Sequence, residues 1–180
     1  MSLKFPEQIE TERLILRRLR PVDAERIFYV YGSKPEATKY VAWPTHQSLE
    51  DARTFLRYSE LGWKKGIEFS YGIFLRKSER MIGSIAVILK DLNSVQLGYI
   101  LGPIHWHFGY ATEACKSFIK TIQSTKSVTR IDSFVDIENT ASANVLLKSG
   151  FSEDTLSKMT IRFVNQNNQI KDCRLFYLLL

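Results

Sequence analysis

The stretch from Val95 to Ile122 constrains the fold more than any other part of the chain. An apolar, strand-like run over 95–101 is followed by a short loop that contains Gly109 and then by an amphipathic helix. A strand, a glycine loop and a helix N-terminus leave backbone amides unpaired and favour negative charge, so this junction predicts a phosphate-binding site. The apolar positions of the helix recur with the period of one helical face: Ala111, Ala114, Cys115, Phe118, Ile119 and Ile122.

Periodicity and turn residues outline the remaining elements. Pro21 and Ser48 are suited to open helices, and Gly32 and Gly150 are suited to end them. The sequence predicts strands over 14–19, 68–75, 81–89, 95–101, 130–137, 155–164 and 172–179, and helices over 21–32, from 48 onward, over 111–122 and over 139–150. This order indicates an α+β (mixed α/β) domain, with a central, mostly antiparallel sheet of about seven strands and about four flanking helices.

Length and composition limit the class of protein. A chain of 180 residues with 44% hydrophobic and 24% charged residues is typical of one globular domain. No repeat or composition shift divides it, so residues 1–180 are expected to form a single domain. No apolar run reaches the length of a membrane span, and the start lacks the apolar core of a signal peptide, which predicts a cytoplasmic protein. The net charge of +6 favours anionic partners, among which nucleic acid ranks last because no basic tail is present.

The cysteines and histidines do not predict a metal centre. Cys115 falls on the apolar face of a predicted helix, which indicates a small buried hydrophobe, and with Cys173 it makes no disulfide framework. His46, His105 and His107 lack metal-ligand spacing with cysteines or carboxylates. We therefore expect no metal.

A second polar junction lies one predicted strand further along the chain. Asn139 and Ser142 follow the strand over 130–137 and open the next helix. Because these residues are three positions apart, their side chains can share one side of the first helical turn. Two polar groups would then face one crevice at the end of an adjacent strand.

Together these motifs resemble the GNAT superfamily of acetyl-CoA-dependent N-acetyltransferases. The resemblance rests on residues 108–114, on 139–142 and on 148–151, in that order and at that spacing. The opening stretch over 10–17 is similar to the usual start of the branch that contains the ribosomal-protein N-terminal acetyltransferases. The resemblance covers nearly the whole chain and implies a GNAT-like fold with acetyl-CoA as the co-substrate.

The resemblance implies a role for each junction. Backbone amides of His107, Phe108, Gly109, Tyr110 and Ala111 would bind the pyrophosphate of coenzyme A, with Thr112 close by. Backbone groups of Tyr99, Ile100 and Leu101 would pair with the pantetheine arm like an added strand, and an amide in the Tyr99 region would steady the oxyanion. Asn139 would contact the pantetheine arm, and Ser142 is the candidate acid that protonates the departing thiolate.

The chain departs from the family pattern at three places. His107 and Phe108 stand where a glycine and then a basic or polar residue are common. Leu146 stands where many members have a tyrosine acid, which makes Ser142 the better candidate; its alternative role is that of a serine satisfying a backbone amide. A carboxylate often found before the Gly–Tyr pair of the preceding strand is absent, and Gln96 lies nearby instead.

The general base and the acceptor pocket each have several candidate residues. A base or a water chain must remove the proton of the amine, and Glu68, Asp136, His46 and Tyr99 can each reach a central crevice, although each also suits a surface or packing role. The acceptor pocket is expected from the final hairpin and from an irregular segment that holds Tyr40, Trp43 and His46. The alternative is an aromatic loop packed on the core. The asparagine-rich turn over 165–169 is expected to be solvated.

The leading functional hypothesis is acetyl transfer from acetyl-CoA to a primary amine, with a protein N-terminus as one candidate acceptor, by a monomer or homodimer. A second hypothesis is acetylation of a small amine such as an antibiotic, a polyamine or an amino acid. A third, of another class, is a non-catalytic acyl-CoA-binding or regulatory module. A nucleic-acid-binding domain, suggested only by the charge, is the last.

Overall fold

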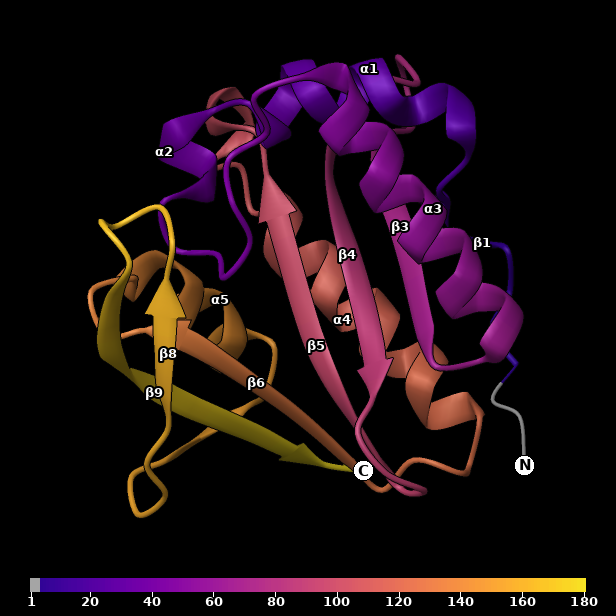
Figure 1. The fold of residues 1–180 in the computed structure, drawn as a ribbon. Coiled ribbons are helices and arrows are strands. Elements are labelled where there is room, and N and C mark those ends of the chain that lie inside the picture. The colour runs from indigo at the N-terminus through magenta and orange to yellow at the C-terminus, as the bar shows by residue number, and fades with distance from the viewer. Residues whose placement is uncertain (1–3) are drawn as a thin grey trace.

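Nine strands pair into one sheet in the computed structural model, which describes residues 4–180. The strands are β1 (Gln8–Glu10), β2 (Leu14–Arg18), β3 (Glu68–Leu75), β4 (Met81–Leu89), β5 (Ser94–Leu101), β6 (Arg130–Asp136), β7 (Ser152–Asp154), β8 (Thr160–Phe163) and β9 (Gln169–Leu179). Their order is β1-β2-β3-β4-β5-β6-β9-β7, and β8 pairs with β9 (Figure 1). The mostly antiparallel sheet is confirmed. The predicted number of strands is too low because β1 and β7, with three residues each, are too short to show an alternating pattern.

Helices cover both faces of this sheet. They are α1 (Ala24–Ile27), α2 (Pro35–Thr38), α3 (Leu49–Lys65), α4 (Tyr110–Ser124) and α5 (Thr140–Lys148), with short turns η1 (Pro21–Asp23), η2 (Phe28–Gly32) and η3 (Pro103–His105). In Figure 1, α3 lies in front of the sheet and α4 behind it. The single helix predicted over 21–32 is a succession of 3-10, α and π geometry, and α2 was not predicted. Within residues 4–180, no helix is both long and apolar enough to cross a membrane.

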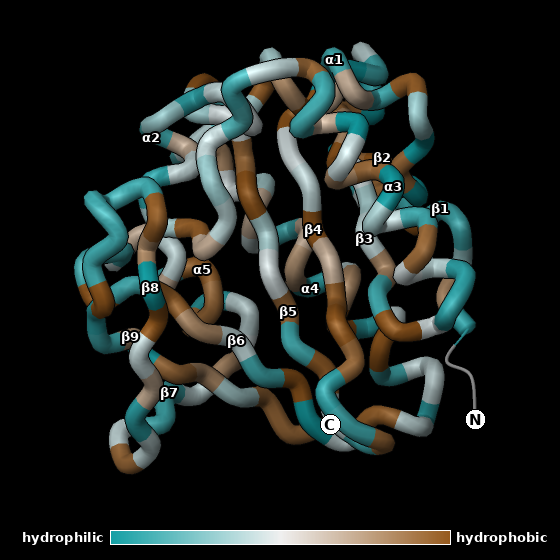
Figure 2. Tube along the Cα trace, viewed as in Figure 1, coloured by the Kyte–Doolittle hydropathy of each residue, from teal (hydrophilic) through white to brown (hydrophobic). Residues whose placement is uncertain are grey.

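Two apolar clusters hold these layers together. On one face, the predicted stripe of α4 is buried against the strands, with Ala114, Cys115 and Phe118 fully inaccessible, which confirms Cys115 as a buried hydrophobe. On the other face, α1 and α3 contribute to a smaller cluster around Ile27 and Ala52. Figure 2 shows hydrophobic residues along the central strands and a hydrophilic turn between β8 and β9.

The central strands separate where the site lies. β5 and β6 are parallel, but they pair only from Ser94 to Gln96, opposite Arg130 to Asp132. Beyond this point β6 continues to pair with β9 up to Asp136, while β5 continues with β4 up to Leu101. The two strands therefore diverge like the arms of a V, as Figure 1 shows to the left of β5. Among residues 4–180, no strand lies beside the backbone of β5 that faces the gap.

Candidate functional site

The edge of β5 that faces the gap carries free backbone groups. The carbonyl of Leu97 accepts a hydrogen bond from Ser133 Oγ at 2.9 Å, and that of Leu101 accepts one from Trp106 Nε1 at 3.0 Å, so both point away from β4. Tyr99 lies midway between them, and strand alternation turns its N–H and C=O the same way. Ile100 has the opposite orientation and pairs with Ser84 of β4. The N–H and C=O of Tyr99 are thus available to an extended ligand that adds itself as a strand.

The side chain of Tyr99 crosses to the helix on the far side of the gap. Its hydroxyl donates a hydrogen bond of 2.9 Å to the carbonyl of Ser142, and burial raises the pKa of Tyr99, which keeps this donor protonated. Asn139 caps α5, because its Oδ1 accepts a hydrogen bond of 3.1 Å from the N–H of Ser142. The helix start predicted at Asn139 is confirmed. This contact leaves the Nδ2 of Asn139 without a partner within residues 4–180.

The glycine loop is shaped by two residues in the left-handed region. His107 has φ 67° and Gly109 has φ 78°, after which α4 begins at Tyr110. The N–H groups from His107 through Thr112 donate to no backbone carbonyl within residues 4–180, and the first intrahelical bond comes from Glu113 to Gly109. These amides and the positive end of the α4 dipole favour an anion at the upper end of the gap.

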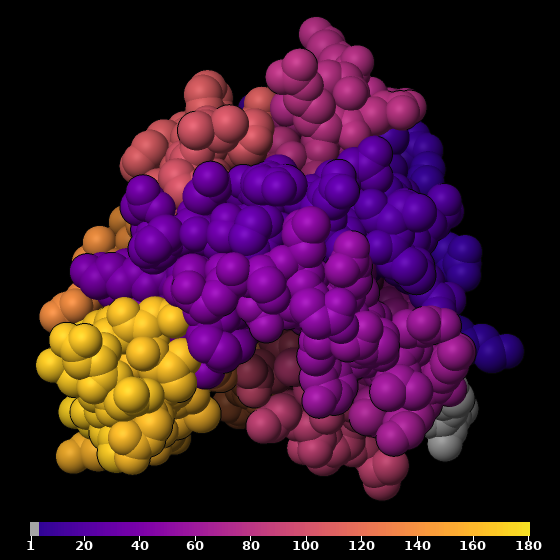
Figure 3. Space-filling view, turned by 45° about the horizontal axis from the view of Figure 1, so that its top comes forward, coloured from indigo at the N-terminus to yellow at the C-terminus, as the bar shows by residue number. Residues whose placement is uncertain are grey.

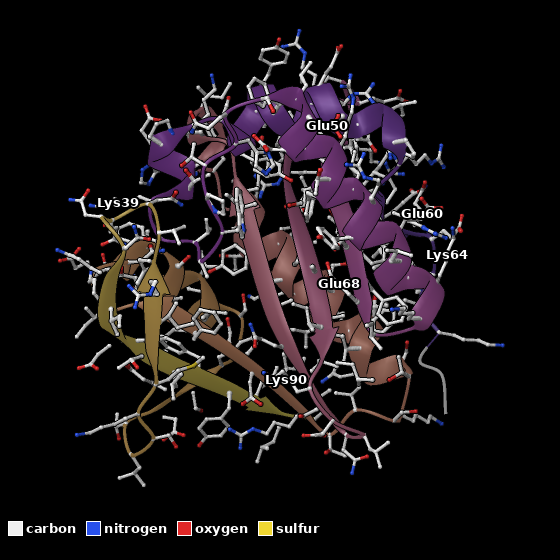
Figure 4. The ribbon with its side chains drawn as sticks, viewed as in Figure 1. Lys39, Glu50, Glu60, Lys64, Glu68 and Lys90 are labelled. Carbon is white, nitrogen blue, oxygen red and sulfur yellow. The ribbon has the colours of Figure 1, made fainter. Side chains whose placement is uncertain are left out.

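The segment that was expected to form a pocket is tied to the final hairpin by Asn165. Asn165 Oδ1 accepts from the N–H of Thr45 at 2.9 Å, and its Nδ2 donates to the carbonyls of Thr38 at 2.7 Å and Trp43 at 2.8 Å. Gln166 adds a bond from Nε2 to the carbonyl of Lys39 at 3.0 Å. Figure 4 shows Lys39 beside the turn of the hairpin. The prediction of a solvated asparagine turn is therefore wrong for Asn165.

The aromatic residues expected in the pocket lie on this tied segment. The rings of Trp43 and His46 have centroids 5.2 Å apart, and both residues are partly buried. Trp43 also packs against the smaller apolar cluster, as expected for the alternative of an aromatic loop packed on the core. Tyr40 is covered by the ammonium of Lys39, 4.8 Å from the ring centroid. The segment thus combines packing with a partly exposed aromatic surface.

An open hollow lies over β5 on the face that carries this segment. Gly98 is exposed although it lies in the middle of a central strand, and a side chain at this position would meet nothing within 4 Å. Figure 3 shows the hollow between the C-terminal strands and the segments from the first third of the chain.

A second depression of about 600 Å³ lies between α2 and the hairpin turn. It is lined by amide side chains, two carboxylates and one ammonium group: Asn165, Gln166, Asn167, Gln169, Glu36, Glu138 and Lys39, together with Pro35 and Thr45. The lining of this depression is therefore polar and of mixed charge.

The four candidate bases have different surroundings in the structure. Glu68 lies against Gly62 of α3 and accepts a hydrogen bond from Ser70 Oγ at 2.7 Å. Burial alone would raise the pKa of Asp136, but hydrogen bonds, including one of 2.9 Å from Lys171, hold it below its ordinary value.

His46 differs from these carboxylates. Burial lowers its pKa, so the ring is neutral near pH 7. Its Nδ1 is buried beside Gly32 and has no hydrogen-bond partner among the described residues. Tyr99 is already engaged with Ser142. Among residues 4–180, no group of three or more histidine, cysteine or acidic side chains is placed to hold a metal ion.

Most of the chain is similar to proteins of one family. Residues 13–152 match the family described as the acetyltransferase (GNAT) domain. The uncharacterized N-acetyltransferase YoaA of Bacillus subtilis (strain 168) is 30% identical over 175 residues, which cover 93% of this chain and 94% of that protein. The microcin C7 self immunity acetyltransferase MccE, solved with acetyl-CoA and AMP, has a TM-score of 0.86 at 19% identity, with 99% of each chain covered. A putative ribosomal-protein-serine acetyltransferase from Vibrio cholerae has a TM-score of 0.80 at 24% identity over the whole of both chains.

Proposed function

The chain belongs to the GNAT family of acetyltransferases, and on that premise we propose that it transfers the acetyl group of acetyl-CoA to the N-terminal amine of a protein, within a ternary complex. The observation that carries this proposal is the presence of three features along one gap. The free edge of Tyr99, the amides of the glycine loop and the open hollow over Gly98 lie along the gap that opens where β5 and β6 separate.

The donor is proposed to lie along the gap. The amides from His107 to Ala111 would bind the pyrophosphate, with the side chain of Thr112 beside them. The pantetheine arm would pair with the C=O of Tyr99 and the N–H of Leu101, which lie on either side of Ile100 in the same strand, and Asn139 would contact the arm through its Nδ2. This arrangement brings the thioester under the hollow.

The chemistry is proposed to be direct attack of a neutral amine on the thioester carbonyl. The N–H of Tyr99 would stabilise the oxyanion, and Ser142 is the candidate acid for the departing thiolate. Among the base candidates, His46 is neutral near pH 7 because burial lowers its pKa, and since its Nδ1 is buried beside Gly32, the proton would have to be accepted at Nε2. A water chain from the hollow is the other route for this proton.

A protein N-terminus fits the acceptor side better than a small polyamine. A peptide backbone presents alternating donors and acceptors, and the side-chain amides of Asn167 and Gln169 supply both. The carboxylate of Glu36 suits an ammonium group, but Glu138 already pairs with Lys171 Nζ at 3.0 Å, and Lys39 adds a further positive charge. A small amine acceptor remains the second candidate, since the hollow also admits a compact substrate.

Calorimetry with acetyl-CoA, followed by thiol-release assays over peptides and small amines, tests the donor and the acceptor in one series. The expected result is acetyl-CoA binding and turnover with peptides that carry a free N-terminus, but not with the same peptides after N-terminal blocking. Turnover with small amines alone would replace the acceptor proposal. Binding without turnover over a broad panel would favour a non-catalytic acyl-CoA-binding module. No binding at millimolar acetyl-CoA would overturn the proposal.

Replacing Asn165 with alanine is expected to loosen the acceptor side. The change leaves the carbonyls of Thr38 and Trp43 and the N–H of Thr45 without their partner, so the free energy of unfolding should fall by about 2 kcal/mol. The KM for the amine should rise while the KM for acetyl-CoA stays constant. Urea denaturation and steady-state kinetics measure both. Asn168→Gly is the matched control, because it removes an exposed amide from the same turn at a φ of 58°. Equal stability of the two variants would contradict the role of Asn165.

Replacing His107 with glycine is expected to leave donor binding intact. The loop is proposed to act through backbone amides, and glycine adopts the observed φ of 67° without steric strain. The affinity for acetyl-CoA should stay within about twofold, measured by calorimetry. His107→Val should lower the free energy of unfolding by about 1 kcal/mol, because a β-branched residue disfavours this conformation. A large loss of affinity in His107→Gly would assign the imidazole itself to the ligand.

A further inference from the structure

Glu113, in the first turn of α4, accepts hydrogen bonds from a segment about one hundred residues earlier in the chain. Its Oε1 accepts from Thr11 Oγ1 at 2.6 Å and from the N–H of Arg13 at 2.9 Å, and its Oε2 accepts from Arg13 Nε at 2.6 Å. Burial alone would raise the pKa of Glu113, but these bonds hold it below its ordinary value. The carboxylate is therefore ionised and fixed in place at neutral pH.

The guanidinium of Arg13 reaches from Glu113 to the glycine loop. Its Nη1 donates a hydrogen bond of 3.0 Å to the carbonyl of Phe108, and its Cζ lies 4.7 Å from the ring centroid of Tyr110. The rings of Phe108 and Tyr110 are themselves stacked, with centroids 5.7 Å apart. A side chain at Gly109 would come within 3.6 Å of Arg13 Nη2, so the arginine packs directly behind the loop.

The planarity of the peptide bond determines the direction of the Gly109 N–H. The carbonyl of Phe108 and the N–H of Gly109 belong to one trans peptide unit and point in opposite directions. Because Arg13 holds this carbonyl on its own side, the N–H of Gly109 is turned toward the opposite, open side of the loop. Gly109 at φ 78° has few steric restraints of its own, so an external contact is needed to fix this orientation.

We propose that Arg13 and Glu113 are positioning residues, which hold the 107–110 loop in the conformation that binds the phosphates of coenzyme A. Arg13 fixes the Phe108–Gly109 peptide, and Glu113 fixes Arg13 through Nε and the backbone N–H. The role needs the planar fork of a guanidinium, which can bond a carboxylate and a carbonyl at once, rather than positive charge alone. This inference rests on the proposed binding of coenzyme A at the loop.

The test compares Arg13→Ala and Arg13→Lys with the wild type, by calorimetry with coenzyme A and by steady-state kinetics. Both variants are expected to weaken coenzyme A binding about tenfold and to raise the KM for acetyl-CoA, without changing kcat or the KM for the amine. Arg174→Ala is the matched control, since it removes a doubly hydrogen-bonded arginine–glutamate pair between β7 and β9. This control should leave the coenzyme A affinity unchanged.

The possible results distinguish a failure of the positioning role of Arg13 from a failure of the proposed function. Failure of the wild type to bind coenzyme A would remove the proposed function itself. Binding by the wild type and equal binding by Arg13→Ala would overturn the positioning role alone. Full recovery in Arg13→Lys would assign the effect to charge attraction and would also overturn it. If Arg13→Ala does not fold, Glu113→Gln is the milder variant, because it keeps an amide oxygen for Thr11 but loses the bond from Arg13 Nε; the same rise in the KM for acetyl-CoA is expected.

Discussion

Replacing Gly83 with alanine is expected to lower the free energy of unfolding by about 3 kcal/mol, among the largest effects of any single methyl group in this chain. Gly83 lies in β4 between Ile73 of β3 and Leu101 of β5. An added Cβ would overlap the carbonyl oxygen of Ile100 and would come within 2.9 Å of Leu101 Cα. Because both atoms belong to the backbone of β5, no side-chain rotation relieves the overlap, and the strands must move apart.

The same change is expected to reduce activity beyond the loss of stability. Displacement of β5 at Ile100 shifts the neighbouring N–H of Tyr99, which is proposed to face the thioester. Urea denaturation gives the stability, and thiol release at a temperature where the variant is folded gives kcat/KM, which should fall at least tenfold. An alanine variant as stable as the wild type would contradict the close approach of β4 and β5.

Gly98 provides the matched control for this experiment. It lies in β5 opposite Ala86, and an added Cβ meets nothing within 4 Å. Gly98→Ala should therefore leave the free energy of unfolding unchanged or raise it by about 0.5 kcal/mol through the reduced freedom of the unfolded chain. The methyl group would project into the hollow, so the KM for the amine is the parameter expected to change. Comparison of Gly83→Ala with Gly98→Ala therefore distinguishes a glycine that close strand packing requires from a glycine that keeps the site open.

The parts of the fold that sequence patterns predicted are those set by local geometry. The stripe from Ala111 to Ile122 has the period of a helix face, and α4 spans Tyr110–Ser124 with that face buried. Ser48 and Asn139 are N-caps as predicted, since the signal for a helix start lies within a few residues. The order of the longer strands and helices follows from the same short-range signals.

The features that were missed depend on pairing over long distances. Asn165 bonds to residues 120 or more positions away, and no property of the turn distinguishes it from its exposed neighbours Asn167 and Asn168. The separation of β5 from β6 after Gln96 leaves no mark on an apolar run that continues to Leu101. A strand pattern indicates which face is buried, but it does not indicate where a neighbouring strand ends.

Replacing Ser142 with alanine is expected to lower kcat about a hundredfold while leaving acetyl-CoA affinity within about twofold. The N–H of Ser142 bonds to Asn139 and its carbonyl accepts from Tyr99, but its Oγ makes no hydrogen bond within residues 4–180. The hydroxyl is therefore free to donate a proton to a thiolate at the end of the gap. Alanine is well suited to a helical first turn, so the fold should be unaffected. Thiol release measures kcat, and calorimetry measures the affinity.

The pH dependence of this defect distinguishes an acid from a structural serine. A departing thiolate needs a proton donor most when the pH lies below the pKa of the thiol, which is about 8.5 for a cysteine. The ratio of wild-type to Ser142→Ala turnover should therefore be largest near pH 7 and should shrink as the pH rises above about 9. Thr140→Ala is the control from the same turn, since Thr140 is exposed and its side chain makes no hydrogen bond within the described residues. A defect that is constant with pH would indicate a positioning role, and unchanged turnover would remove Ser142 from the mechanism and leave water as the proton donor.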